Sequence, residues 1–225
     1  MSFFVLFCLV FCPLFLVANG QYVFPDKAAL VIAVAAWIAD ESSATVTYGA
    51  INTWDLSQVT DMSALFKDET TFNSDISNWD VGSVTRMDRM FQSATSFNQD
   101  VSNWNVGSVT TMEYMFLYAS SFNQNMINWN VSGVTNMYYM FKSATVFNGD
   151  ISNWNVGSVT NIGSMFQSAS AFNGDISGWD ISSVTRMDFV FFVATSFNGD
   201  LSGWNVSSAT NMRSMFGSAY LFNGD

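Results

Sequence analysis

Tryptophan recurs at a fixed step of 25 residues from Trp54 to Trp204. A Phe-Asn pair keeps the same step, from Phe72-Asn73 to Phe222-Asn223. Folded onto one period, the unit reads F-N-x-D-I-S-x-W-(D/N)-V-x-x-V-T-x-M-x-x-M-F-x-x-A-(S/T)-x. A period between about 20 and 29 residues is typical of leucine-rich-repeat-like solenoids, in which each unit stacks on its neighbours to bury its apolar face. The spacing therefore predicts one elongated core.

Each unit is expected to contain a short strand, a return segment and a short helix. Asp75–Ser77 and its equivalents are the predicted strands, and their edge-to-edge stacking would form a parallel sheet. Thr85 is the expected N-cap of a helix whose apolar residues recur at helical spacing up to Ala94. The fold class predicted is an α/β repeat, a right-handed leucine-rich-repeat-like solenoid. The residues expected to face inward are Trp79, Val81, Val84, Met87, Met90, Phe91 and Ala94.

The repeats divide the chain into three parts. Residues 51–225 hold seven 25-residue repeats, and residues 21–50 do not fit the period. Within 21–50 we predict a helix over about 26–40, started by Asp26, which covers the open end of the core as an N-terminal cap. The chain ends inside a unit, so further repeats or another domain are expected beyond residue 225.

Residues 1–20 have the pattern of a signal peptide. The run from Phe3 to Ala18 is almost wholly apolar and is followed by small residues suited to signal peptidase. The alternative is an uncleaved anchor helix, although the run is short for a membrane span. Because both cysteines, Cys8 and Cys12, lie in this leader, the mature chain is expected to have none. A secreted or cell-surface location follows.

Composition and charge argue against several classes of function. The formal net charge of −11 disfavours nucleic acid and anionic membrane surfaces as partners. The apolar stretch of the predicted cap helix is too short to cross a bilayer, so no membrane insertion of the mature chain is expected. The chain has no histidine, no Gly-rich phosphate loop and no Cys/His metal set. We therefore expect no enzyme, catalytic residue, cofactor or metal site, with catalysis by carboxylate pairs as the remaining alternative.

The repeat unit F-N-x-D-I-S-x-W-D-V-x-x-V-T-x-M-x-x-M-F closely resembles that of BspA-type leucine-rich-repeat surface proteins. The resemblance extends over Ile51 to Asp225, about three quarters of the chain. It implies a secreted or cell-surface protein for adhesion or binding. It carries over no catalytic residue and no ligand.

Three polar columns recur once per repeat. The aspartates at the Asp75 position could bridge Ca²⁺ or simply be solvated turn residues that accept backbone hydrogen bonds. The asparagines at the Asn73 position are predicted to form an internal amide ladder. The threonines at the Thr85 position suit helix capping, with an ice-binding rank as the alternative.

The columns that vary between repeats are more informative for binding. Several outward positions carry large apolar or aromatic residues where other units have Ser, Gln or Gly. Clustered exposed aromatics indicate a contact surface. The alternatives are packing between coils or burial under an adjacent domain. The candidate contact residues are Tyr114, Leu117, Tyr118, Ile127, Tyr138, Tyr139, Phe189 and Phe192.

Two N-glycosylation sequons begin at Asn130 and Asn205, both directly after the recurring Trp. This column mixes Asp with Asn, which favours an exposed, solvated turn over a buried ladder. Both asparagines are therefore candidate glycosylation sites.

These observations together predict a non-enzymatic extracellular or cell-surface binding or adhesion module. Its expected partner is an extracellular protein or glycan. The alternative is a structural spacer of a cell wall or extracellular matrix.

Overall fold

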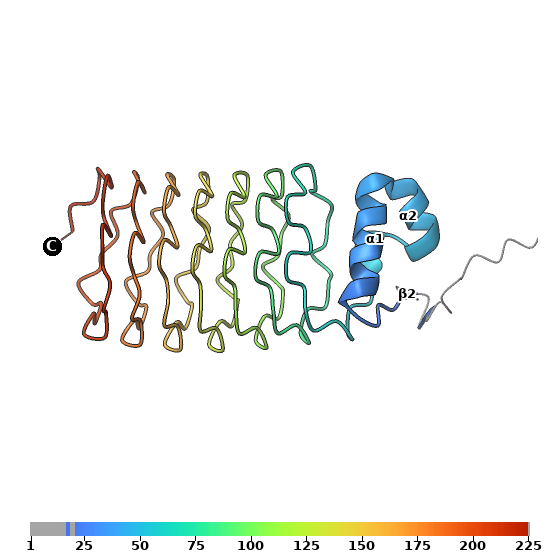
Figure 1. Cartoon of the computed structure of the whole chain (residues 1–225), viewed down its shortest axis with the longest axis horizontal. Helices are drawn as coiled ribbons and strands as arrows, with labels where there is room; N and C mark the ends of the chain where they lie inside the picture. Colours follow the sequence, from blue (N-terminus) through green and yellow to red (C-terminus); the bar gives the residue numbers. More distant parts are fainter. Residues whose placement is uncertain (1–16, 19–20, 225) are drawn as a thin grey trace, which may run out of the picture.

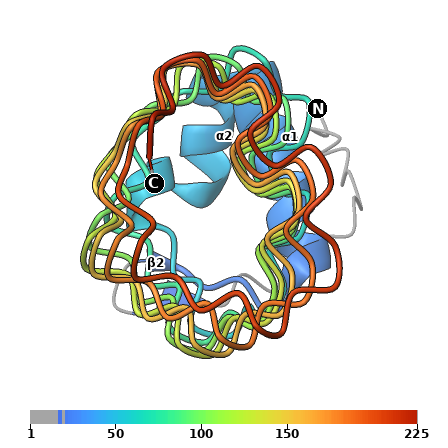
Figure 2. The same cartoon turned by 90° about the vertical axis from the view of Figure 1, so that its left-hand side faces the viewer.

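The chain is described by a computed structural model that covers residues 17–18 and 21–224. The 25-residue units lie side by side as a nearly straight stack of coils, with a helical region at one end (Figure 1). Seen along the stack, successive coils overlay one another (Figure 2). The predicted leader, residues 1–20, lies outside the described residues except for 17–18. Residue 225 also lies outside them.

The regular secondary structure lies at the N-terminal end. Two short strands, β1 (Val17–Ala18) and β2 (Gln21–Tyr22), pair antiparallel. They are followed by helices α1 (Lys27–Ala39) and α2 (Glu41–Tyr48) and by a 3₁₀ turn at Ile51–Thr53.

Helix α1 lies where the cap helix was predicted. Asp26 caps it, since its side chain accepts a hydrogen bond from the Ala29 amide. The buried residues of α1 are Leu30, Ala33, Val34 and Trp37. The Trp37 indole donates to Ser74 Oγ at 2.9 Å and meets the Trp54 ring edge-on at 5.9 Å. α1 thus packs on the first coil and covers one end of the core. Among the described residues, no helix has the length and hydrophobicity needed to span a bilayer.

Helix α2 was not predicted from the sequence. Asp40 ends α1 and caps α2, because its carboxylate accepts from the amides and hydroxyls of Ser42 and Ser43. Hydrogen bonds from the Ser43 and Ser42 side chains lower the pKa of Asp40 to about 2. The two helices are therefore separated by a single exposed aspartate that serves both.

Backbone hydrogen bonds join each coil to the next. The amides of Met87, Arg89, Phe91 and Ser93 donate to carbonyls of the following coil at 2.7–3.3 Å. Isolated parallel bridges mark the same contact six times, from Asp61–Arg86 to Arg186–Asn211. Phenylalanine rings equivalent to Phe91 follow one another with centroids 5.4–5.8 Å apart.

The short helix predicted in each repeat is wrong. The segment after Met87 is a run of overlapping turns in which amides donate three residues back, as Met90 does to Met87. Arg89 and Ser93 have positive φ values of 60° and 58°, which an α-helix excludes. Packed helices need about 8–10 Å between axes. The segments of neighbouring coils are hydrogen-bonded to each other through their backbones and are therefore only about 4.8 Å apart, so a helix in every coil would not fit.

The predicted strand at Asp75–Ser77 is also wrong. Asp75 accepts from the Ser77 amide and Trp79 donates back to Ile76, so this segment is a turn. Parallel pairing occurs instead at the residue before the first methionine, such as Arg86. Thr85 caps no helix, because both its amide and its hydroxyl donate to the Thr60 carbonyl of the preceding coil.

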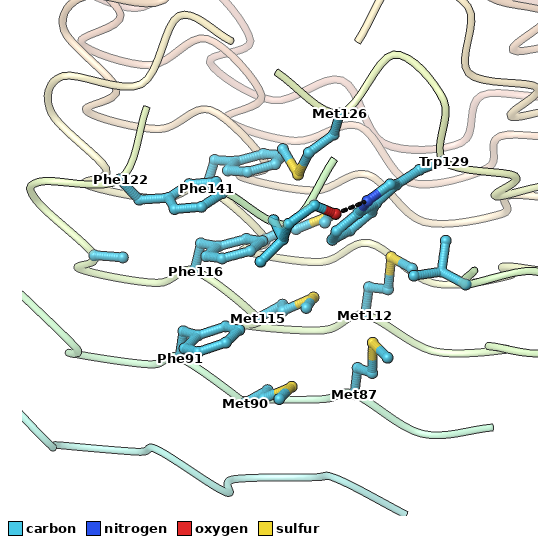
Figure 3. Packing of buried hydrophobic residues seen from close by; sticks show 14 of the residues in the cluster. Met87, Met90, Phe91, Met112, Met115, Phe116, Phe122, Met126, Trp129 and Phe141 are labelled. Carbon is cyan, nitrogen blue, oxygen red and sulfur yellow. Dashed lines mark hydrogen bonds between the residues drawn. The ribbon is translucent and has the colours of Figure 1, made fainter. Parts of the chain in front are cut away.

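The residues predicted to face inward are all buried. The recurring indoles stack at 6.2–6.5 Å, and from Trp79 onward each donates to a carbonyl 28 residues earlier, as Trp129 does to Val101 at 2.9 Å. Figure 3 shows this bond, with Met112 near the indole and Phe116 and Phe122 further along the same core. Each coil therefore contacts its neighbour through stacked aromatic rings as well as through backbone hydrogen bonds.

Replacing the central indole tests this packing. We expect Trp129→Ala to lower the free energy of unfolding by about 3–5 kcal/mol, because it leaves a cavity and an unpaired Val101 carbonyl. Ser152→Ala, in an exposed turn, should change it by less than about 0.5 kcal/mol. Urea denaturation followed by circular dichroism measures both. Equal losses would contradict the assignment of inside and outside.

Candidate functional site

Three of the predicted contact residues form one cluster on the outside of the turn segment. Tyr114 and Tyr139 stack at 5.3 Å with an interplanar angle of 8°. Tyr138 meets both rings edge-on, at 5.7 Å from Tyr114 and 3.9 Å from Tyr139. All three side chains are half-buried. The stacking of adjacent coils thus brings together aromatic residues from two repeats.

Two of these tyrosines occupy a strained backbone position. Tyr114 and Tyr139 have φ values of 58° and 60°, and Phe189 holds the same position two coils further on with φ 58°. The left-handed region costs about 1–2 kcal/mol for a residue with a Cβ, and bulky residues are unusual there. Local backbone preference therefore does not account for aromatic residues at these positions.

Positively charged side chains cover the aromatic rings. Arg89 lies over Tyr114 at 4.9 Å, and Lys142 lies over Tyr139 at 4.4 Å. Arg186 lies over Tyr138 at 4.6 Å, donates to its hydroxyl at 3.4 Å and also binds Asp188. Cation–π contacts of this kind hold both partners in place.

Tyr138 crosses one whole coil to reach Arg186. A Cβ built on Gly163 of the intervening coil would lie 3.1 Å from the Tyr138 ring and 3.1 Å from Asp188 Oδ1. The missing side chain at Gly163 therefore leaves the space that the ring occupies.

A second aromatic pair lies further along the stack. Phe189 and Phe192 meet edge-on at 5.5 Å, and Arg213 lies over Phe189 at 5.6 Å. A Cβ on Gly217 would lie 2.6 Å from the Phe192 ring, so a glycine again makes room for an aromatic side chain.

Three predicted contact residues do not join these groups. Leu117 is buried and 8% exposed, so it is part of the packing between coils and not of the outer surface. Tyr118 is 47% exposed but makes no ring or cation contact among the described residues. Ile127 lies in the Asp-x-Ser turn segment of its coil, away from the Met-to-Phe segment that bears the tyrosines.

Charge is unevenly distributed around each coil. All six Lys and Arg residues of the repeats lie between the residue before the first methionine of the turn segment and the residue after its phenylalanine: Lys67, Arg86, Arg89, Lys142, Arg186 and Arg213. The same segment holds four acidic residues, Asp61, Asp88, Glu113 and Asp188, so its net charge is positive. Elsewhere the only charged residues of the repeats are Asp and Glu. The aromatic cluster therefore lies on the one basic face of an acidic chain.

The cations and glycines of this face were missed from the sequence. Aligning the repeats would have shown that Lys67, Arg89, Lys142 and Arg213 fall in the same outward columns as the aromatics, with Arg86 and Arg186 in a column two positions before that of Tyr138. The reach of Tyr138 over Gly163 to Arg186 could not be found this way, because it depends on side-chain conformation across three coils.

The other polar columns have structural partners. Asp75, Asp100, Asp150 and their equivalents each accept a hydrogen bond from the serine amide two residues later. No group of three or more His, Cys, Asp or Glu side chains within the described ranges is placed to hold a metal ion. Asn73 accepts from the Asn98 amide, and this pattern continues to Asn223. The ladder is exposed, however, and not internal as predicted.

Both sequon asparagines lie in exposed turns. Asn130 Oδ1 accepts from the amide and the hydroxyl of Ser132, at 3.2 and 2.7 Å. Asn205 Oδ1 accepts from the Ser207 amide at 3.1 Å. The Asn130 amide nitrogen faces Gly107 of the preceding coil, where a Cβ would lie 3.4 Å from it.

The stacked coils and the one face that carries both aromatic and positively charged side chains define a repeat protein with one candidate interaction surface. A family model matches residues 38–150 and 124–225, and its description is "Mycoplasma protein of unknown function, DUF285". The chain belongs to this family, which is the BspA-like repeat family in its general sense. No curated protein and no solved structure matches the chain.

Titration of Tyr138 tests the geometry of the cluster. Burial, a hydrogen bond with Tyr139 and the nearby Tyr139 charge raise the pKa of Tyr138 from 10.0 to about 12. Because the folded pKa is raised, the stabilisation is complete below pH about 10 and is lost as the pH rises towards 12. The ultraviolet titration of the wild type minus that of Tyr138→Phe should show one phenol ionising near pH 12. A difference curve centred at pH 10 would contradict the cluster.

Secretion from a eukaryotic cell tests the exposed turn. We expect Asn130 to carry a glycan, because its side chain is exposed and the sequon serine is within hydrogen-bonding distance. Mass spectrometry with and without glycan removal measures occupancy, and Asn130→Gln is the control. An unmodified Asn130 beside an occupied reference sequon in the same cells would count against this placement.

Proposed function

We propose that this chain is a non-enzymatic extracellular or cell-surface binding module of the BspA-type leucine-rich-repeat surface proteins. In this proposal the stack of coils is a right-handed solenoid of the leucine-rich-repeat class that presents its ligand-binding face outward. The partner is an extracellular protein or glycan. The sequence pattern of the leader supports secretion, and the lack of histidine and of cysteine beyond Cys12 supports a role without catalysis.

One observation carries the proposal. Tyr114, Tyr138 and Tyr139 are gathered, half-exposed, on an outer face where other coils carry small or polar residues. Tyrosine anchors of this kind are enriched at interaction surfaces. Packing between coils does not require them, because Ser164 and Ser214 hold the column of Tyr139 in other coils.

A structural spacer is the second candidate. The inter-coil ladder is continuous from Asp61 to Asn211, and such a ladder suits a rigid element that separates two attachments. On this alternative the aromatic face would have no ligand of its own.

Ligand capture distinguishes the two. The chain, purified after secretion and immobilised, is expected to retain a specific extracellular protein or glycan. Tyr114→Ser with Tyr139→Ser should abolish retention without unfolding the stack, because serine occurs naturally in this column. Tyr118→Ser, outside the cluster, is the matched control and should bind like the wild type. Absence of any ligand, or equal binding by both variants, would favour the spacer.

A further inference from the structure

The basic face contains positive charges without a carboxylate partner. Arg86 and Arg186 are paired with Asp88 and Asp188, at 3.0 and 2.7 Å. Arg89, Lys142 and Arg213, by contrast, have no carboxylate within ion-pair distance in the part of the chain that the structure describes. Their charged groups rest on the faces of Tyr114, Tyr139 and Phe189.

This arrangement is unusual for a chain with a net charge of −11. With 18 acidic residues available, ion pairing could have neutralised all seven Lys and Arg side chains. Instead, three cations are held over aromatic rings, which leaves part of each charged group open to solvent or to a ligand. Cations that are held in place over rings and have no carboxylate partner can bind an anionic group of a ligand.

The three cations are also arranged along the axis of the stack. Arg89 belongs to the coil that begins at Trp79 and Arg213 to the coil that begins at Trp204, five coils further along the stack, with Lys142 between them. The half-buried rings of Tyr114, Tyr139 and Phe189 lie in the coils between those of Arg89 and Arg213 and add apolar surface to the same face. A ligand matching this face would be linear, with anionic groups and apolar surfaces alternating along its length.

From these contacts we infer that the face from Arg89 to Arg213 binds an acidic polysaccharide lying along the stack. A pyranose ring has an apolar C–H surface that packs on an aromatic side chain, whose ring face is electron-rich. Its carboxylate or sulfate group meets the arginine or lysine beside that ring. An acidic peptide supplies the charge but has no flat apolar ring next to each carboxylate. This inference rests on the proposed binding function and names the ligand class for the same surface.

The probes are polygalacturonate, which is carboxylated, and dextran sulfate, which is sulfated. Neutral dextran is the control for a sugar without charge, and poly-L-glutamate is the control for charge without a sugar. We expect the secreted chain to bind at least one acidic polysaccharide, to bind both controls at least tenfold more weakly, and to lose affinity as salt rises. Comparison of the two acidic probes identifies the preferred anionic group.

Matched variants locate the site. Arg89→Gln, Lys142→Gln and Arg213→Gln together should weaken binding by about eightfold to a hundredfold, since each exposed charge contributes about two- to fivefold. Lys67→Gln removes a cation from the same column as Lys142, but one already paired with Asp68 at 3.4 Å, and should leave affinity unchanged. Tyr139→Ser should weaken binding by about tenfold. Circular dichroism melting confirms that each variant is folded.

The outcomes separate this inference from the proposed function. Failure of both acidic polysaccharides, equal binding of poly-L-glutamate, or equal loss in Lys67→Gln and the triple variant would overturn the inference. If the chain then still captures an extracellular protein through Tyr114 and Tyr139, the binding function stands with a protein as its ligand. If it captures nothing, both proposals fail.

Discussion

The short step between coils, close enough for their backbones to be hydrogen-bonded, is the constraint on which the rest of the structure depends. It is set by backbone amides that donate to the next coil and by indole and phenyl rings in stacking contact. At this spacing the chain cannot place a helix in each coil, so its turn segment alternates right- and left-handed residues. Every second amide of the segment then donates to the next coil, as that of Phe91 does, while the amides between them donate three residues back within the coil, as that of Met90 does.

The same step places side chains on the outer surface. A residue in one coil lies next to its counterpart 25 residues away, so Arg89, Tyr114 and Tyr139 form a continuous column although they are far apart in sequence. Longer side chains reach further, as Tyr138 does when it passes over Gly163 to Arg186. On the outer surface, residues at the same repeat position therefore line up along the stack, and residues of one coil lie across it. Variation within a column adds chemistry without disturbing the core.

Conservation of backbone geometry across coils explains why that variation is tolerated. Two positions per turn segment have positive φ in every coil, and they are occupied by alanine, serine, aspartate, arginine, tyrosine, phenylalanine and valine. Each carries the strain of a left-handed residue, which glycine would avoid. Neighbouring coils fix this geometry through the ladder, so the outward residue can be chosen for its contacts. Aromatic and cationic residues can therefore occupy these outward positions without changing the backbone.

The sequence by itself determined the repeat, its length and the inside of each coil. Trp79, Met87, Phe91 and their equivalents are apolar at one position in every unit, and only a shared interior explains that regularity. It also singled out the tyrosines, because they break a pattern of small and polar residues. Only the tertiary structure decided the backbone path between these points. The spacing of Met87, Met90, Phe91 and Ala94 fits both a helix and a chain of alternating turns, and hydrogen bonds to a neighbouring coil selected the turns. The pairing of rings with cations was decided in the same way, since it requires coils close enough for side chains of different repeats to touch.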